Sequence, residues 1–162
     1  MATASLSPEL VSKLEAAQSA SRILANLSTA QKNQALAAIA DVIDANHAAI
    51  LEANAKDVEA GIASGIAEGL IDRLRFTPER LLSLASAVRD VISLPDPIGV
   101  VVRGNDMPNG IHLSQVRVPF GVVGAIYEAR PNVTVDIAAL CIKSGNAAVL
   151  RGGSAAENTN TV

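Results

Sequence analysis

The first 97 residues carry apolar side chains at the spacing of α-helices. Ser7-Pro8, Ser28 with Gln31, and Thr77-Pro78 are typical of helix N-termini, and each precedes a run of helical periodicity. A further helix is expected over about residues 46–60. The residues expected to face a core are Leu10, Leu14, Ala17, Leu24, Leu36, Ile39, Ile43, Ile50, Leu51, Val58, Leu81, Leu82, Leu84, Ala85, Val88 and Val91.

Beyond Pro97 the pattern changes to that of β-strands. Ile98–Arg103 and Ile111–Val118 are strand-like runs joined by the turn-rich segment Gly104–Gly110. Polar residues alternate with apolar ones along the second run, so one face of the pair is expected to be solvated. The segment is therefore predicted to form a long β-hairpin.

Residues 119–154 have the pattern of one strand–helix–strand unit. Val118–Ile126 and Asn146–Leu150 are short apolar runs typical of buried strands. Between them, Pro131–Lys143 begins with a proline and ends before Gly145, which is the asymmetry that helix termini favour. Two such strands flanking one helix within about 30 residues indicate a right-handed parallel crossover.

The predicted fold class is therefore α/β, with N-terminal helices, a long β-hairpin and the start of a Rossmann-like parallel sheet. We assign residues 1–97 to the helical part, 98–118 to the hairpin and 119–162 to the first strand–helix–strand unit. Two parallel strands are too few to cover both faces of their helices. We therefore expect the sequence to be the N-terminal part of a longer protein, with an incomplete sheet.

Composition restricts the partners. The net charge is −3 and the pI is about 5.3, so no general attraction to nucleic acid or to an anionic membrane is expected. Aromatic residues make up only 2%, which argues against base stacking, and no apolar run reaches the roughly 20 residues that span a bilayer. A single cysteine suits a reducing compartment, so we expect a cytoplasmic protein. No cluster of ligating residues predicts a metal site.

Polar residues that can carry chemistry follow the first strand of this unit. In parallel sheets, ligands bind where strands end and helices begin. Asn132 stands at the start of the predicted helix, where it is either an N-cap or an amide that points at an anion together with free backbone N–H groups. Arg130 can bind a phosphate or carboxylate through its planar fork, or it can pair structurally with Glu128.

A second polar turn, Arg151-Gly152-Gly153-Ser154, follows the second strand. Its glycines allow close approach of the backbone, and its Arg and Ser can contact a phosphate or ribose hydroxyls. The alternative is an ordinary glycine turn. Cys141 lies in the middle of the predicted helix between two apolar residues, where we expect a structural thiol and not a nucleophile.

A resemblance to the gamma-glutamyl phosphate reductases, also called glutamate-5-semialdehyde dehydrogenases, rests on VPFGVVGAIYEARPNVTVD and LCIKSGNAAVLRGGS. That family belongs to the aldehyde dehydrogenase superfamily, and its N-terminal helices are similar to ILEANAKDVEAG and LIDRLRFTPERL here. The resemblance implies NADPH-dependent reduction of L-glutamyl 5-phosphate to L-glutamate 5-semialdehyde and phosphate. This reaction is the second step of proline biosynthesis from glutamate.

The resemblance also implies residue roles. Asn132 matches the superfamily asparagine that helps to hold the oxyanion of the tetrahedral intermediate, and Arg130 and Glu128 would contact substrate. An arginine at position 151, where a lysine is common in the superfamily, fits the 2′-phosphate of NADPH. The cofactor-binding residues are then Arg151, Gly152, Gly153 and Ser154. The family's nucleophilic cysteine and general base lie downstream, so these 162 residues alone are expected to be inactive.

The resemblance makes the hairpin an oligomerisation arm, which implies a homo-oligomer. It also makes glutamate 5-kinase a plausible functional partner, because an acyl phosphate hydrolyses readily. Two alternatives stay open. One is a non-catalytic assembly module, which NADPH titration would distinguish, and the other is a superfamily member with a different acyl substrate.

Overall fold

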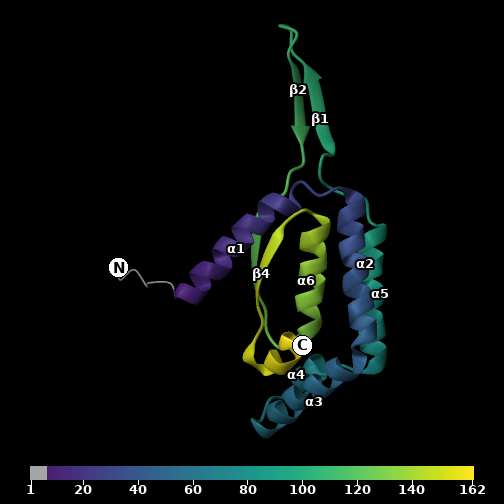
Figure 1. The fold of residues 1–162 in the computed structure, drawn as a ribbon, viewed down its shortest axis with the longest axis vertical. Coiled ribbons are helices and arrows are strands. Elements are labelled where there is room, and N and C mark those ends of the chain that lie inside the picture. The colour runs from purple at the N-terminus through teal and green to yellow at the C-terminus, as the bar shows by residue number, and fades with distance from the viewer. Residues whose placement is uncertain (1–6) are drawn as a thin grey trace.

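The computed structural model describes residues 7–162. In chain order the elements are α1 (Pro8–Leu24), α2 (Thr29–Ala45), α3 (His47–Ala63), α4 (Glu68–Leu74), α5 (Pro78–Ser93), β1 (Val101–Asp106), β2 (His112–Val116), β3 (Val122–Ile126), α6 (Pro131–Lys143), β4 (Ala147–Arg151), the 3₁₀ helix η1 (Ser154–Ala156) and α7 (Glu157–Thr161). The predicted α/β class is confirmed (Figure 1).

Local capping explains where α1, α2 and α5 begin. The side-chain oxygens of Ser7, Ser28 and Thr77 each accept a hydrogen bond from a backbone N–H of the first turn. At Ser28 the capping box is complete, because its backbone N–H donates to Gln31 Oε1 at 2.9 Å. These three starts agree with the sequence pattern, whereas α3 continues to Ala63, beyond its predicted end.

The strand–helix–strand unit forms the centre of the fold. β3 and β4 pair in parallel, with Ile126 opposite Arg151, and α6 connects them over the predicted range Pro131–Lys143. α1 lies on one side of this small sheet and α6 on the other, and the α2–α5 pair packs against α6 (Figure 1). Gly145 ends α6 with a φ of +70°, a conformation that favours glycine.

The main apolar core lies between α2, α5 and α6. Its buried members are Leu36, Ala40, Ile43, Leu81, Leu84, Ala85, Val88 and Ala139. The core assignment is wrong for Leu10 and Leu14, each 38% exposed, and for Leu82, which is 57% exposed. The N-terminal half of α1 extends away from the body, so its apolar positions have no surface to pack against (Figure 1). Leu82 lies on the side of α5 that faces solvent.

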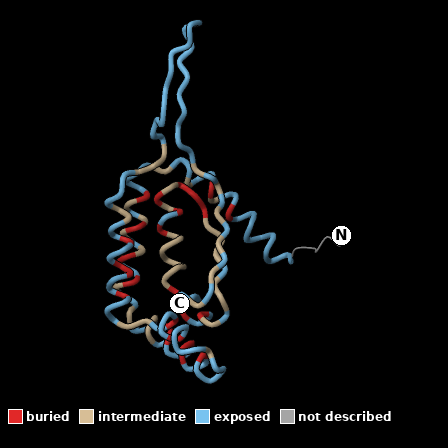
Figure 2. The backbone as a smooth tube through the Cα atoms, turned by 180° about the vertical axis from the view of Figure 1, so that it is seen from behind, coloured by how far each residue is buried: buried red, intermediate tan, exposed pale blue. Residues whose placement is uncertain are grey.

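The hairpin projects from the body and is exposed along both strands (Figures 1 and 2). Its presence is confirmed, with Asp106 opposite His112 in an antiparallel pair. Its predicted bounds are wrong, because residues 104–106 belong to β1 and not to the tip. The tip closes where Met107 N–H donates to the Ile111 carbonyl at 2.9 Å, so cross-strand hydrogen bonding overrides the turn preference of Gly and Asn.

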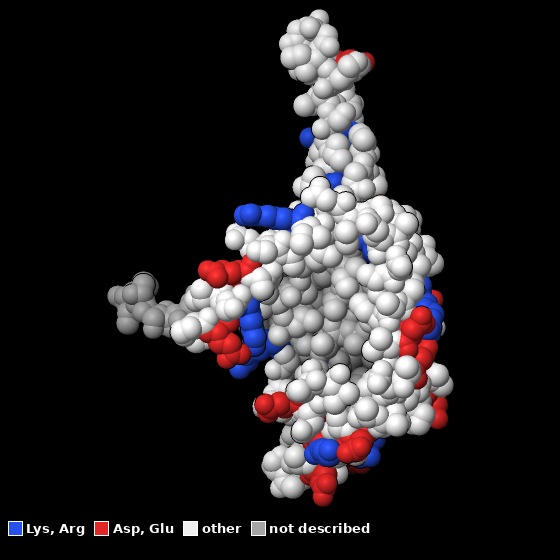
Figure 3. Space-filling model, viewed as in Figure 1, with Lys and Arg blue, Asp and Glu red and all other residues white. Residues whose placement is uncertain are grey.

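One face of the body is hollowed between α1 and the α2–α5 pair (Figure 3). The floor of this hollow shows no charged side chain, and Lys, Arg, Asp and Glu lie around it (Figure 3). None of the helices within residues 7–162 combines the length and the hydropathy required to cross a bilayer.

Candidate functional site

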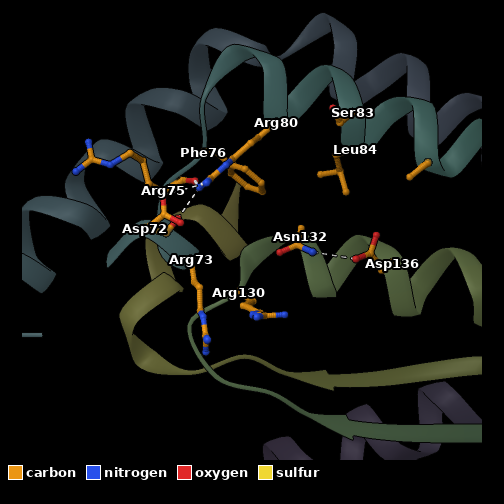
Figure 4. A pocket seen from close by; sticks show the side chains of 11 residues that line it. Asp72, Arg73, Arg75, Phe76, Arg80, Ser83, Leu84, Arg130, Asn132 and Asp136 are labelled. Carbon is orange, nitrogen blue, oxygen red and sulfur yellow. Dashed lines mark hydrogen bonds and ion pairs between the residues drawn. The ribbon is translucent and has the colours of Figure 1, made fainter. Parts of the chain in front are cut away.

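A cavity of about 420 Å³ lies between α4, the start of α5 and the first turns of α6 (Figure 4). It is lined by Asp72, Arg73, Arg75, Phe76, Arg80, Ser83, Leu84, Ala87, Arg130, Asn132 and Asp136. A concave surface with a few convergent polar groups is the usual form of a small-molecule site. Two residues singled out in the sequence, Arg130 and Asn132, are among those lining it.

The first turn of α6 holds Asn132 in place. Pro131 occupies the first helical position, and Arg130 is the N-cap residue, without a side-chain capping bond. The half-buried Asn132 donates from Nδ2 to Asp136 Oδ2 at 3.0 Å, one helical turn later. The alternative that Asn132 is the N-cap is therefore wrong. Because an amide nitrogen carries two N–H groups, one remains for a ligand.

The arginines around the cavity differ in their partners. Arg80 is satisfied, since Nη2 donates to Asp72 Oδ1 at 3.0 Å and Nη1 to the Arg75 carbonyl at 2.8 Å. The Arg75 side chain extends away from Asn132 (Figure 4). Arg73, Arg75 and Arg130 form no ion pair with any residue in the range 7–162. Three guanidinium groups of the cavity lining are therefore available to an anion.

The loops at the carboxyl ends of β3 and β4 lie against each other. Tyr127 N–H donates to the Arg151 carbonyl at 3.1 Å, which continues the ladder past the end of β3. Arg130 N–H donates to the Glu128 carbonyl at 2.8 Å, but their side chains form no ion pair among the described residues. The structural pairing considered for Arg130 and Glu128 is therefore not found.

At Gly152 and Gly153, the positions that a Cβ atom would occupy lie against other protein atoms. A Cβ at Gly152 would lie 2.5 Å from Asn160 Nδ2, and one at Gly153 would lie 3.3 Å from the Glu128 carbonyl carbon. A larger residue at either position would displace the Asn160 side chain or crowd the backbone at Glu128. The structure divides the predicted residues into two groups, with Arg130 and Asn132 at the cavity. The group beside the end of β4 consists of Glu128, Arg151, Gly152, Gly153 and Ser154.

A buried polar network holds the linker between α4 and α5. Asn54, only 2% exposed, donates from Nδ2 to the Leu74 carbonyl at 2.9 Å and accepts at Oδ1 from Phe76 N–H at 2.7 Å. Asp57, one turn further along α3, accepts from two backbone N–H groups of α7 at 3.1 and 2.8 Å. Asn54 therefore fixes the segment that brings Phe76 and its neighbours to the cavity.

The sequence analysis did not identify Arg73, Asp136 or Asn54. The only local signal for Asp136 is its spacing of four residues from Asn132, which places both on one helix face. For Asn54, the signal is a polar residue on the side of α3 that also carries buried Ala53 and Val58. Arg73 belongs to a segment far from Asn132 in sequence, so only the fold brings them to one cavity.

The remaining reactive side chains do not form a second site. Cys141 is buried, and burial raises the pKa of its thiol, which keeps it protonated and unreactive. His47 Nε2 lies 3.6 Å from Asp44 Oδ1, and the exposed His112 pairs with Asp106 on the hairpin. Within residues 7–162, no group of three or more His, Cys, Asp and Glu side chains is arranged to hold a metal ion.

Sequence comparison and structure comparison with known proteins find relatives of the same kind. No family model matches the chain. It is 55% identical over 162 residues to the gamma-glutamyl phosphate reductase of Leifsonia xyli, covering 38% of that protein, and 59% identical over 154 residues to that of Clavibacter michiganensis, covering 36%. The crystal structure of the Thermotoga maritima gamma-glutamyl phosphate reductase matches with a TM-score of 0.91 at 42% identity, over 94% of this chain and 37% of that one.

The fold class is α/β, with β3 and β4 in a parallel pair, and it matches that of the solved gamma-glutamyl phosphate reductase over 94% of this chain. Over 94% or more of its length, the chain is similar in sequence or fold to gamma-glutamyl phosphate reductases. It spans a little over a third of the length of the relatives that it matches.

Proposed function

We propose that this chain takes part in the NADPH-dependent reduction of L-glutamyl 5-phosphate to L-glutamate 5-semialdehyde and phosphate, the second step of proline biosynthesis from glutamate. The observation that carries the proposal is the Asn132 amide in the first turn of α6. It keeps one N–H for a ligand, in a cavity that also holds guanidinium groups with no ion-pair partner among residues 7–162. The names of the relatives supply the reaction class.

The geometry suits the addition step of such a reaction. A nucleophile adds to the acyl carbon, negative charge develops on the carbonyl oxygen, and phosphate leaves as its bond to that carbon breaks. The remaining N–H of Asn132 and the positive end of α6 would stabilise this charge, and one such donor typically contributes about 10²–10³ to kcat. Arg130 would bind the phosphate. The single cysteine, buried Cys141, does not line the cavity, so we assign the thiolate to sequence outside these 162 residues.

The residues after β4 fit a phosphorylated nicotinamide cofactor. Arg151 is exposed and forms no ion pair with any of residues 7–162, so its guanidinium is available to the 2′-phosphate. The exposed Ser154 would contact the ribose hydroxyls, and Gly152 and Gly153 shape the turn between the two. NADPH, when bound, supplies the hydride for the reduction.

A chimeric reductase tests the proposal. In it, this chain replaces the matching segment of the Leifsonia xyli reductase, to which it is 55% identical. The reverse reaction is followed as NADPH formed from glutamate 5-semialdehyde, phosphate and NADP⁺. Arg151→Ala should raise KM for NADP⁺ by about 10- to 100-fold, because a charge-assisted contact is lost, and leave KM for NAD⁺ nearly unchanged.

The exposed Arg22→Ala is the matched control and should change neither KM. Equal losses for the two cofactors in Arg151→Ala would contradict the 2′-phosphate assignment. A folded chimeric reductase without activity toward glutamate 5-semialdehyde would contradict the reaction itself.

We further propose that the hairpin is an assembly arm that pairs with a second copy. Val101, Ile111 and Leu113 are 57%, 58% and 60% exposed, and an uncovered apolar strand pair is typical of an interface. Leu113→Asp should reduce the mass of the chimeric reductase in sedimentation, and an unchanged mass would contradict the assignment.

We also propose a cytoplasmic location and functional coupling to glutamate 5-kinase, since an acyl phosphate is short-lived in water.

A further inference from the structure

We infer that Asp136 binds the amino-acid end of the substrate through its α-ammonium group. The inference rests on the proposed function and deepens it. It assigns a residue that distinguishes a glutamyl group from other acyl groups, away from the reacting carbon.

Asp136 lacks a cationic partner. Its Oδ2 accepts from the neutral amide of Asn132 at 3.0 Å, and no Lys, Arg or His among residues 7–162 forms an ion pair with it. The side chain is half-buried and lines the cavity. A partly desolvated carboxylate is stabilised most by a charged N–H donor, so Asp136 favours a cationic ligand.

The other charged residues of the cavity also suit the charged groups of the substrate. Arg80 and Asp72 neutralise each other, and Arg75 extends away from Asn132 (Figure 4). Arg73 extends toward the loop that enters α6, where Arg130 lies (Figure 4). The cavity therefore offers one carboxylate, that of Asp136, to a cationic ligand group, and guanidinium groups to anionic ones. L-Glutamyl 5-phosphate carries one ammonium group, together with a carboxylate and a phosphate, which agree with these groups in sign.

The distance between the acyl carbon and the α-nitrogen of the substrate also fits the spacing of Asn132 and Asp136. The two N–H groups of one amide reach acceptors roughly 5 Å apart, so an oxyanion bound to Asn132 would lie roughly 5 Å from the Asp136 carboxylate. In a glutamyl chain the α-nitrogen is four bonds from the reacting carbon, about 5 Å when extended. One ligand can therefore place its acyl oxygen at Asn132 and its ammonium at the second oxygen of Asp136.

Asp136→Asn in the chimeric reductase tests the inference, because it keeps the size of the side chain and an acceptor for Asn132 but removes the charge. We compare kcat/KM for glutamate 5-semialdehyde with that for 5-oxopentanoate, the same chain without the amino group. The variant should lose about 10- to 100-fold for the amino acid and little for the analogue. Asp136→Glu, which keeps the charge, should retain part of the preference.

Asp90→Asn is the control, because Asp90 is an exposed carboxylate of α5 that does not line the cavity, and it should leave the preference for the amino acid unchanged.

The outcomes separate the two proposals. Equal losses on both substrates in Asp136→Asn, or equal losses in Asp136→Asn and Asp136→Glu, would mean that Asp136 acts only by holding Asn132, and would overturn the inference. If the unsubstituted chimeric reductase is folded but reduces or oxidises neither substrate, the proposed function fails, and the inference fails with it.

Discussion

The buried ion pair between α2 and the segment after α5 allows a quantitative prediction. Lys32 Nζ lies 3.0 and 3.2 Å from the two carboxylate oxygens of Asp96, and the side chains are 1% and 13% exposed. Lys32→Met keeps the aliphatic stem but leaves the Asp96 carboxylate without its cation. Removing one partner of a buried pair typically costs about 3–5 kcal/mol, and we expect a loss of that size in the free energy of unfolding.

The pair also gives a pH dependence of known sign. Burial alone would raise the pKa of Asp96, but hydrogen bonds from Ile98 N–H, Lys32 and Thr29 outweigh it, and the net pKa is lowered. A carboxyl whose pKa is lower in the folded state stabilises the fold above its unfolded pKa, about 3.9. That stabilisation is lost as the pH falls through the folded value. The difference between wild type and Lys32→Met should therefore be constant near neutral pH and shrink below about pH 4.

Urea unfolding followed by circular dichroism measures both effects. Lys13→Met is the control, because Lys13 and Glu9 form an exposed pair, and it should cause no measurable loss. The double variant Lys32→Met/Asp96→Leu should recover much of the loss, since no unpaired charge remains buried. A Lys32→Met protein within about 1 kcal/mol of wild type at neutral pH would refute the reasoning.

Three further predictions concern the fold. Gly145→Ala should lower the free energy of unfolding by at least about 1–2 kcal/mol, because the φ of Gly145 is +70° and a Cβ there would lie 3.1 Å from Pro119. Gly69→Ala is the control: Gly69 lies in open space inside α4, so this change should be neutral or stabilising by up to about 1 kcal/mol. Equal unfolding midpoints for the two variants would contradict this. Asp57→Ala should cost about 3 kcal/mol and detach α7, seen as faster amide hydrogen exchange there; unchanged exchange would count against the network. Cys141 should react with a thiol reagent only in denaturant, and rapid labelling of the native protein would show that it is accessible.

Features set by local chemistry could be predicted from the sequence. The caps at Ser28 and Thr77 fix where α2 and α5 begin, and Pro131 with Gly145 fixes α6, because each depends on residues within one turn. The hairpin bounds could not be predicted in the same way. Gly104 has the preference of a turn residue, but its pairing with Ser114 on the opposite strand places it within β1.

Features that depend on contacts between distant segments could not be predicted from the local sequence pattern. An apolar face shows that a helix can pack but not which part of it meets a partner, so Leu10 and Leu82 were assigned to a core that they do not reach. The cavity joins Arg73 of α4 to Asn132 and Asp136 of α6, and Asn54 of α3 holds its linker. Only Asn132 of these was predicted, because it follows a strand at the start of a helix.

The central claim is that the side chain of Asn132 stabilises negative charge on the acyl oxygen, and its most direct test is the kcat of the chimeric reductase with Asn132→Ala. We predict a fall of about 10²–10³ in kcat with KM nearly unchanged, since the lost contact forms only as the charge develops. A kcat equal to that of the unsubstituted enzyme would contradict the account.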